Sequence, residues 1–253
     1  MSKITLKGLK KFNLIMVGLH AVQGVAVLLL SKDFTRPITG NYLSFNEATQ
    51  SLQPVTTTLF NAKFVYLIAG FFFLSALAHL IIATVYNKTY NANLKRGINK
   101  ARWIEYSLSA STMIVAISML VGVYDISSLI MLFALTAIMN LMGLVMEVSN
   151  EGEKQPNWLS YWVGCFAGAV PWVVVAYYMW LGAVNGSAAP TFVYWIYVSI
   201  FLFFNAFAIN MWLQYAKIGK WQDYLYGERS YIVLSLVAKS LLAWQVFGGT
   251  LQP

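Results

Sequence analysis

The chain has 253 residues, of which 59% are hydrophobic and only 10% are charged, whereas soluble domains carry roughly 25% charged residues. This deficit, together with uncharged runs near the roughly 20 residues that cross a hydrocarbon layer, excludes an ordinary soluble domain and predicts a multi-pass protein of the cell membrane, in contact with lipid. The formal net charge of +8 is more typical of membrane orientation than of nucleic-acid binding, so we expect no nucleic-acid partner.

Seven long, largely apolar segments follow one another along the chain and predict an all-α membrane protein, a seven-transmembrane helix bundle that forms a single domain over residues 1–253. The expected spans are residues 12–30, 60–86, 103–123, 128–149, 159–184, 193–215 and 231–251. Short connections favour antiparallel neighbours within one bundle. The exception is the first outer connection, 31–59, where turn residues alternate with strand formers. We expect a small β-hairpin lying over the outer face, with a disordered loop as the alternative.

The basic residues fall almost entirely on one side of these spans. Thirteen Lys and Arg residues precede the first span or lie in alternate connections, whereas only Lys32, Arg36 and Lys63 lie on the other side. By the positive-inside rule the N-terminus is cytoplasmic, and an odd number of spans places the C-terminus outside the cell. The basic connections are also able to bind a cytoplasmic protein, but the positive-inside rule already accounts for them, so no such partner is identified.

Two strongly ionisable residues remain well inside the spans, Glu105 in the third and Lys239 in the seventh. A central lysine costs roughly 2.5 to 3.5 kcal/mol on insertion scales, so its presence indicates a function. Burial favours the neutral amine, which is the nucleophile that forms a Schiff base with an aldehyde, and Glu105 is placed to balance the resulting cation. The alternatives are a plain ion pair, a coupling site in a transporter and, for Glu105, a favourable position near a helix N-terminus.

Aromatic residues at helical spacing offer the long apolar slot that a polyene needs. The sixth span places four residues on one face at i, i+3, i+4 and i+7, namely Ile200, Phe203, Phe204 and Phe207. We expect Trp172, beside the helix-bending Pro171, to close the far end of the slot. The alternative is that these rings face lipid or serve only in helix packing.

Long motifs in the chain resemble a known family. The segments RWIEYSLS (102–109) and YGERSYIVLSLVAKSLLAWQ (226–245) resemble the third- and seventh-helix signatures of heliorhodopsins, as do GCFAGAVPW (164–172) and LFFNAFA (202–208). The resemblance covers essentially the whole chain. It implies all-trans retinal bound covalently to Lys239, Glu105 as the Schiff-base counterion, and a homodimer whose outer loops contribute to the contact. We therefore expect a light sensor rather than an enzyme, without catalytic residues.

Departures from ordinary microbial rhodopsins narrow this expectation. Those proteins usually have a second carboxylate four residues before the lysine, where this chain has Ser235, and proton pumps usually have a donor carboxylate eleven residues after the counterion, where it has Ala116. The Schiff base is therefore expected to depend on one carboxylate. Residues four and eight beyond the counterion are Ser109 and Met113, which fit pocket lining next to Tyr106.

The two histidines of the chain, His20 and His79, lie roughly 12 Å from the cytoplasmic ends of their spans at a rise of 1.5 Å per residue. We expect them to share a polar cavity with the counterion and to accept the Schiff-base proton after light absorption. The alternative is two unrelated, hydrogen-bonded histidines. Because Cys165 is the only cysteine, the chain has too few ligands for a metal site and no internal disulfide.

The outer half of the bundle offers few groups that can move a proton. Beyond the buried lysine its helix has only Gln245 and Thr250, and the third helix has Ser118. Without an outward relay, a proton that leaves the Schiff base is expected to return from the inner side. The sequence therefore predicts light sensing or light-dependent regulation with a slow photocycle and no sustained pumping. The alternatives are a light-driven or light-gated ion (proton) transporter and a retinal-free transporter or regulator.

Overall fold

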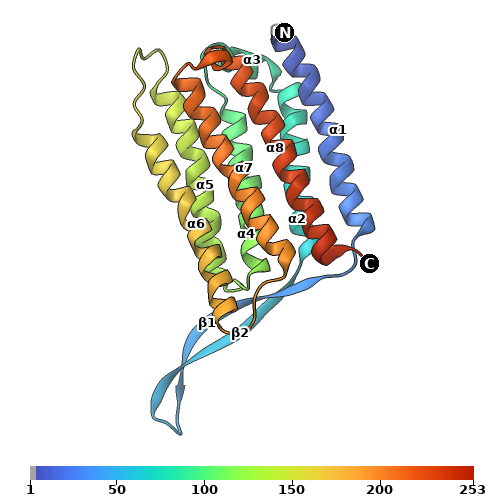
Figure 1. Cartoon of the computed structure of the whole chain (residues 1–253), viewed down its shortest axis with the longest axis vertical. Coiled ribbons are helices and arrows are strands. Elements are labelled where there is room, and N and C mark those ends of the chain that lie inside the picture. Colours follow the sequence, from blue (N-terminus) through green and yellow to red (C-terminus); the bar gives the residue numbers. More distant parts are fainter. Residues whose placement is uncertain (1–3) are drawn as a thin grey trace.

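Seven helices of the computed structural model, which describes residues 4–253, are long and apolar enough to cross a membrane (Figure 1). They are α1 (Leu6–Leu30), α2 (Phe64–Ala83), α4 (Lys100–Leu120), α5 (Ile126–Ser149), α6 (Leu159–Val184), α7 (Thr191–Tyr215) and α8 (Tyr224–Val246), the last extended by the π-helical turn η2 (Phe247–Leu251). The short helix α3 (Asn87–Lys95) and the 3-10 turn η1 (Gly219–Gln222) lie in connections. The predicted seven-helix membrane bundle is confirmed.

Several helices extend beyond the uncharged segments of the sequence. Helix α1 begins at Leu6 rather than at residue 12, because Thr5 caps it by accepting a hydrogen bond from the Gly8 amide at 3.1 Å. Helix α8 begins at Tyr224 rather than at residue 231, with Asp223 as its N-cap. Conversely, residues 60–63 of the expected second span belong to a strand. Charged residues mark where the hydrocarbon layer ends, and a capped helix continues past that point.

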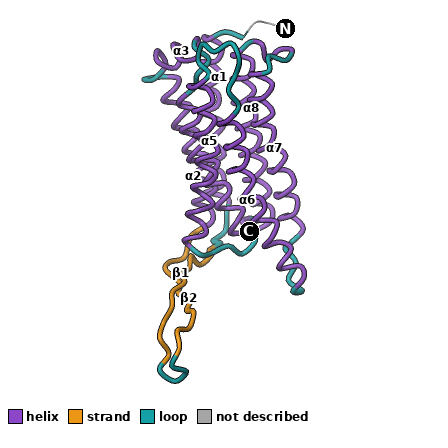
Figure 2. Tube along the Cα trace, turned by 90° about the vertical axis from the view of Figure 1, so that its left-hand side faces the viewer, coloured by secondary structure: helices purple, strands orange, loops and turns teal. Residues whose placement is uncertain are grey.

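A two-stranded antiparallel hairpin fills the connection between α1 and α2. Strand β1 (Thr35–Asn46) pairs with β2 (Ser51–Lys63), from Thr35 opposite Lys63 to Asn46 opposite Ser51, with a bulge after Ile38. Its expected position over the outer face is wrong, because the hairpin projects away from the end of the bundle (Figures 1 and 2). The base of the hairpin contacts the bundle. Ile38 is buried there, and the Thr39 amide donates to the Tyr124 carbonyl oxygen at 2.9 Å.

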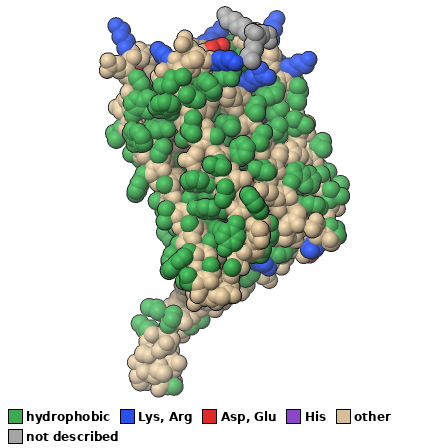
Figure 3. All heavy atoms as spheres, in the orientation of Figure 1, with side chains coloured by type: hydrophobic (Ala, Val, Ile, Leu, Met, Phe, Trp, Pro, Cys, Tyr) green, Lys and Arg blue, Asp and Glu red, His purple; other side chains and the backbone are tan. Residues whose placement is uncertain are grey.

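The opposite end of the bundle carries the N-terminus and α3, and Lys and Arg side chains gather there, whereas the sides of the bundle are largely hydrophobic (Figure 3). We call this end the basic end. Exposed apolar residues on the sides include Val22, Tyr66, Phe166, Val173 and Trp195. Such a surface is suited to lipid rather than to water.

Three charged residues near the basic end form a buried cluster, which we call the inner clamp: Arg102 of α4, Glu147 of α5 and Glu228 of α8. The Arg102 guanidinium donates to both carboxylates, and the three side chains are only 2–3% exposed. From sequence, Arg102 is expected in the connection just before the third span, and this expectation is wrong. The helices extend past the apolar segments, so the guanidinium lies inside the bundle rather than at its surface.

Neutral donors surround the inner clamp and make its burial tolerable. Glu147 accepts from the Trp103 indole nitrogen at 2.7 Å and from the Tyr224 hydroxyl at 2.9 Å. Glu228 accepts from the side-chain amide of Asn99 at 2.7 Å and from the Tyr90 hydroxyl at 3.1 Å. The clamp therefore joins α3, α4, α5 and α8 at one level.

Close helix packing beside the clamp depends on Gly143 of α5. A Cβ added there would lie 2.5 Å from the ring of Trp103, so a larger residue would push the indole away from α5. The glycine thus allows the same indole to reach Glu147, which lies one turn further along α5.

We expect Arg102→Met to destabilise the bundle strongly. The substitution keeps an apolar stem of similar length but leaves two carboxylates buried without their cation. Breaking a buried ion pair by removing one partner costs about 3 to 5 kcal/mol, and the free energy of unfolding should fall by about that amount. Denaturant unfolding in mixed micelles, followed by the helical circular dichroism signal, measures it.

Arg96→Met is the matched control. Arg96 pairs with Glu151 at the surface of the same end, with side chains 56% and 34% exposed. Exposed ion pairs contribute little to stability, so this variant should unfold almost like the parent. Equal losses in the two variants would show that the inner clamp is no more important than a surface pair.

Candidate functional site

A buried ion pair between Lys239 and Glu105 lies at the centre of the bundle. The Lys239 ammonium nitrogen is 3.2 Å from Glu105 Oε1, and the two side chains are 3% and 6% exposed. Lys239 also donates to Ser235 Oγ at 2.7 Å, from one turn earlier on the same face of α8. Ser75 of α2 donates to Glu105 Oε1 at 2.6 Å. Each member of the pair thus has a second polar partner, as a buried charge requires.

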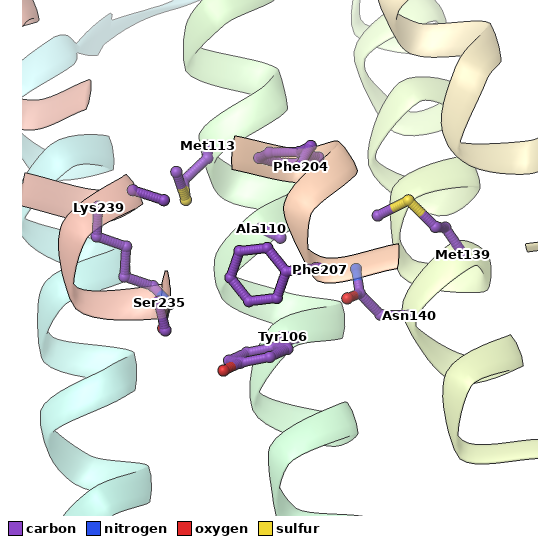
Figure 4. A pocket seen from close by; sticks show the side chains of 10 residues that line it. Tyr106, Ala110, Met113, Met139, Asn140, Phe204, Phe207, Ser235 and Lys239 are labelled. Atoms are coloured by element: carbon purple, nitrogen blue, oxygen red, sulfur yellow. Dashed lines mark hydrogen bonds between the residues drawn. The ribbon is translucent and has the colours of Figure 1, made fainter. Parts of the chain in front are cut away.

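A small cavity of about 40 Å³ adjoins the lysine. Its lining comes from α4, α5, α7 and α8: Tyr106, Ala110, Met113, Met139, Asn140, Phe204, Phe207, Ser235, Ala238 and Lys239. Lys239 and Ser235 lie on one side of this space and Met139 and Asn140 on the other, with the rings of Tyr106 and Phe207 between them (Figure 4). The cavity therefore runs across the bundle, with polar groups at its two ends and mostly apolar walls.

Six residues expected at the site line this cavity: Tyr106, Met113, Phe204, Phe207, Ser235 and Lys239. Glu105 adjoins it through its ion pair. The other four expected residues lie outside the lining: Ser109, Trp172, Ile200 and Phe203. Of these, Trp172 packs edge-on against Phe204, with ring centroids 5.3 Å apart, and so supports the wall from behind.

The two histidines lie side by side between α1 and α2. The rings of His20 and His79 are stacked, with centroids 5.5 Å apart and planes inclined by 10°. His79 Nδ1 is 2.6 Å from Asn13 Oδ1, whereas neither His20 ring nitrogen has a hydrogen-bond partner among the described residues. His79 follows Ser75 by one turn of α2, so this pair lies one turn from the hydroxyl that contacts Glu105.

Comparison with known protein families decides what kind of chain this is. The family model described as Heliorhodopsin matches residues 9–251. The chain belongs to the heliorhodopsin family. No curated protein matches it by sequence comparison.

Solved structures of other rhodopsins share the fold of this heliorhodopsin-family chain. A light-driven proton pump from Leptosphaeria maculans is 15% identical, with a TM-score of 0.66 over 95% of this chain and 93% of the pump. Cyanorhodopsin from the cyanobacterium Tolypothrix sp. NIES-4075 is 14% identical, with a TM-score of 0.58 over 97% of this chain and 94% of the other. At these identities the likeness shows the fold alone.

Membership of the heliorhodopsin family implies a retinal chromophore, and the residues at the cavity fit one. A polyene aldehyde needs an amine at the end of an apolar space, and Lys239 is the one cavity-lining residue that has an amine. The carboxylate of Glu105 lies within ion-pairing distance of that amine. The rings of Tyr106, Phe204 and Phe207 supply flat apolar walls.

Sequence reasoning missed four lining residues, Ala110, Met139, Asn140 and Ala238, as well as Ser75 beside the counterion. A polar signal for two of them was present, since Asn140 and Ser75 lie within membrane spans, where an amide or hydroxyl requires a partner. Met139 and the two alanines give no such signal. Whether they face the cavity depends on the rotation of each helix.

Proposed function

We propose that this protein is a light sensor in which all-trans retinal is bound to Lys239 as a Schiff base and Glu105 is the counterion. The observation that carries the proposal is a buried amine that adjoins an apolar cavity and lies 3.2 Å from a single carboxylate. Lys239 would hold the retinal aldehyde as an imine, formed with release of one water. Retinal supplies the absorption of visible light.

The residues around the amine are arranged to stabilise a positive charge at its nitrogen. Glu105 supplies the negative charge, and the Ser75 hydroxyl orients that carboxylate by donating to the same oxygen that faces Lys239. Ser235 occupies the position one turn before the lysine, where a second carboxylate would otherwise share this task. Removal of Glu105 therefore leaves no other carboxylate in ion-pairing contact with Lys239 among residues 4–253.

The distribution of polar groups favours sensing over transport. Beyond Lys239, toward the hairpin, α8 buries only apolar side chains, and Ser118 is the one buried polar residue in the last two turns of α4. The buried polar groups of the histidine pair and of the inner clamp lie instead on the side of the basic end. A pump needs such groups on both sides of the chromophore, so we propose a slow photocycle in which the proton returns from the side that it left. Light-driven proton transport is the alternative.

The hairpin offers a surface for assembly, and the basic end indicates the orientation in the membrane. Exposed apolar residues of the hairpin, among them Tyr42, Leu43 and Phe45, are available for the outer contact of a homodimer, and the mass of the purified protein in detergent tests this assembly. The basic end is proposed to face the cytoplasm under the positive-inside rule. The same positive charge would also suit the binding of a cytoplasmic protein at that end.

We expect Lys239→Ala to abolish the pigment. When all-trans retinal is added to the purified apoprotein, the parent should develop a visible absorbance band and the variant should not. Lys63→Ala is the matched control, because Lys63 is exposed near the hairpin and pairs with Asp33. A hydroxylamine-sensitive visible band in Lys239→Ala would place the chromophore on another amine.

We expect Glu105→Gln to shift the visible absorbance band of the pigment to longer wavelength, since without the anion the positive charge spreads along the polyene.

We expect the histidine pair to receive the Schiff-base proton after light absorption, as neutral imidazoles near the counterion are able to do. His20→Ala and His79→Ala should then change the lifetime of the deprotonated intermediate while leaving the dark spectrum nearly unaltered. Flash photolysis measures both. Kinetics that match the parent in the two variants would restrict the histidines to a structural role.

We expect illumination to produce no sustained ion transport. Liposomes that contain the pigment should show no protonophore-sensitive pH change, and voltage-clamped membranes should show no stationary photocurrent. Protease applied outside intact cells should cleave the hairpin. Such cleavage would show that the hairpin faces outward in the cells used for the transport assay. A lasting photocurrent would instead support the transporter alternative.

A further inference from the structure

A groove on the lipid-facing side of the bundle runs between α7 and α8 near the basic end, where the two helices lie side by side (Figure 1). Its volume is about 570 Å³, and it is open to the outside of the bundle. Its lining residues are Ala206, Ile209, Asn210, Leu213, Trp221, Tyr226, Arg229, Ser230, Val233 and Leu234. None of them lines the cavity beside Lys239, so the groove is a separate feature.

The end of the groove that lies toward the basic end has a fixed aromatic wall. The Trp221 indole donates to Asn210 Oδ1 at 2.7 Å, and the Asn210 side-chain amide donates to the Gly227 carbonyl oxygen at 3.2 Å. The Trp221 ring packs edge-on against Tyr226, with centroids 5.0 Å apart. Trp and Tyr are the residues that favour the boundary between lipid tails and headgroups. This wall therefore marks headgroup level.

A cation lies at the same level. Arg229 is exposed on α8 and forms no ion pair with an Asp or Glu among residues 4–253. Its guanidinium carbon is 5.8 Å from the centroid of the Phe12 ring, on the side of α8 that faces α1. Lys220 adds a second positive charge nearby, with Nζ 5.9 Å from the Tyr226 ring centroid. Arg229 thus borders the α7–α8 groove while its guanidinium lies toward α1, and the groove lining itself has no carboxylate.

The rest of the groove is aliphatic. Ile209 and Val233 are 53% and 41% exposed, and Leu213 and Leu234 contribute further apolar surface. From Leu213 to Ala206 the wall extends over about 10 Å at 1.5 Å per residue. A chain of methylene groups can lie along this wall and continue over Val233 and Leu234, which follow Arg229 on α8.

We propose that the groove is a specific site for one anionic phospholipid of the leaflet at the basic end. The lipid phosphate binds Arg229, which matches phosphate oxygens through its planar fork of donors. Trp221 and Tyr226 lie beside the glycerol region, and one acyl chain lies against Ile209 and Val233. Basic pockets between membrane helices are suited to anionic headgroups. This proposal needs only membrane insertion and does not rest on the chromophore.

Native mass spectrometry of the purified full chain in detergent tests the site, with phosphatidylglycerol and phosphatidylcholine of the same acyl chains as probes. The parent should bind one phosphatidylglycerol more tightly than phosphatidylcholine. Arg229→Gln should weaken phosphatidylglycerol binding by about fivefold, the change expected for one basic residue near an anionic headgroup. Lys88→Gln is the matched control, because Lys88 is an exposed basic residue on α3 at the same end.

A second pair of variants tests the acyl-chain part of the groove. Ile209→Trp fills the α7–α8 groove and should lower the affinity for phosphatidylglycerol. Ile15→Trp places the same ring in the neighbouring α1–α8 groove, which Arg229 also borders, and should leave the affinity unchanged.

Arg229→Lys keeps the positive charge and should weaken phosphatidylglycerol binding less than twofold. This variant replaces Arg229→Gln if Arg229→Gln does not retain the helical circular dichroism spectrum of the parent.

Four results would overturn the proposal. Equal affinities for the two lipids would remove the requirement for an anionic headgroup. An unchanged affinity in Arg229→Gln, or a loss in Ile15→Trp instead of Ile209→Trp, would place the lipid elsewhere. Displacement of the lipid by millimolar inorganic phosphate would show a simple phosphate site in which the apolar groove contributes nothing.

Discussion

A lysine amine that cannot reach water constrains the helices around it. Transferring an ion out of water costs several kcal/mol even after relaxation, and attraction to a partner offsets this only when further hydrogen bonds complete the geometry. Lys239 meets this requirement through Glu105 of α4 and Ser235 of its own helix, while Ser75 of α2 completes the carboxylate. Three helices must therefore keep fixed positions along the bundle axis for one charge to be tolerated.

Two further contacts hold α4 and α8 in that alignment. Arg102 precedes Glu105 by three residues on α4 and binds Glu228, which precedes Lys239 by eleven residues on α8. Between these levels, the Tyr106 hydroxyl donates to the Tyr231 carbonyl oxygen at 2.9 Å. The two helices are thus joined at three successive levels. A sliding movement of α8 along α4 that changes the Lys239 contact also changes the inner clamp.

How much of this arrangement can be read from sequence depends on how strongly each residue constrains its own position. Lys239 and Glu105 could be identified because a charge in the middle of an apolar span has few tolerable surroundings. Arg102 and Glu228 could not, since a charge near the end of a span is equally compatible with solvent and with a buried pair. For Met139 the limit is helix rotation, because α5 has no central charge that fixes which face is inward. The direction of the hairpin depends on contacts at its base alone.

The two ends of the bundle differ in how many polar groups they bury. This difference decides where the bundle can rearrange at low cost. Toward the hairpin, α8 buries only apolar side chains that pack closely, and such packing has few alternative arrangements. Toward the basic end, a buried apolar cluster that includes Leu9, Met16 and Ile82 lies beside hydrogen-bonded networks. The donors and acceptors of these networks can exchange partners without opening a cavity. Glu147 and Tyr224 belong to the inner clamp network and also line a surface pocket with Arg96 and Glu151. A change at Lys239 can therefore be passed through the inner clamp to the surface of the basic end.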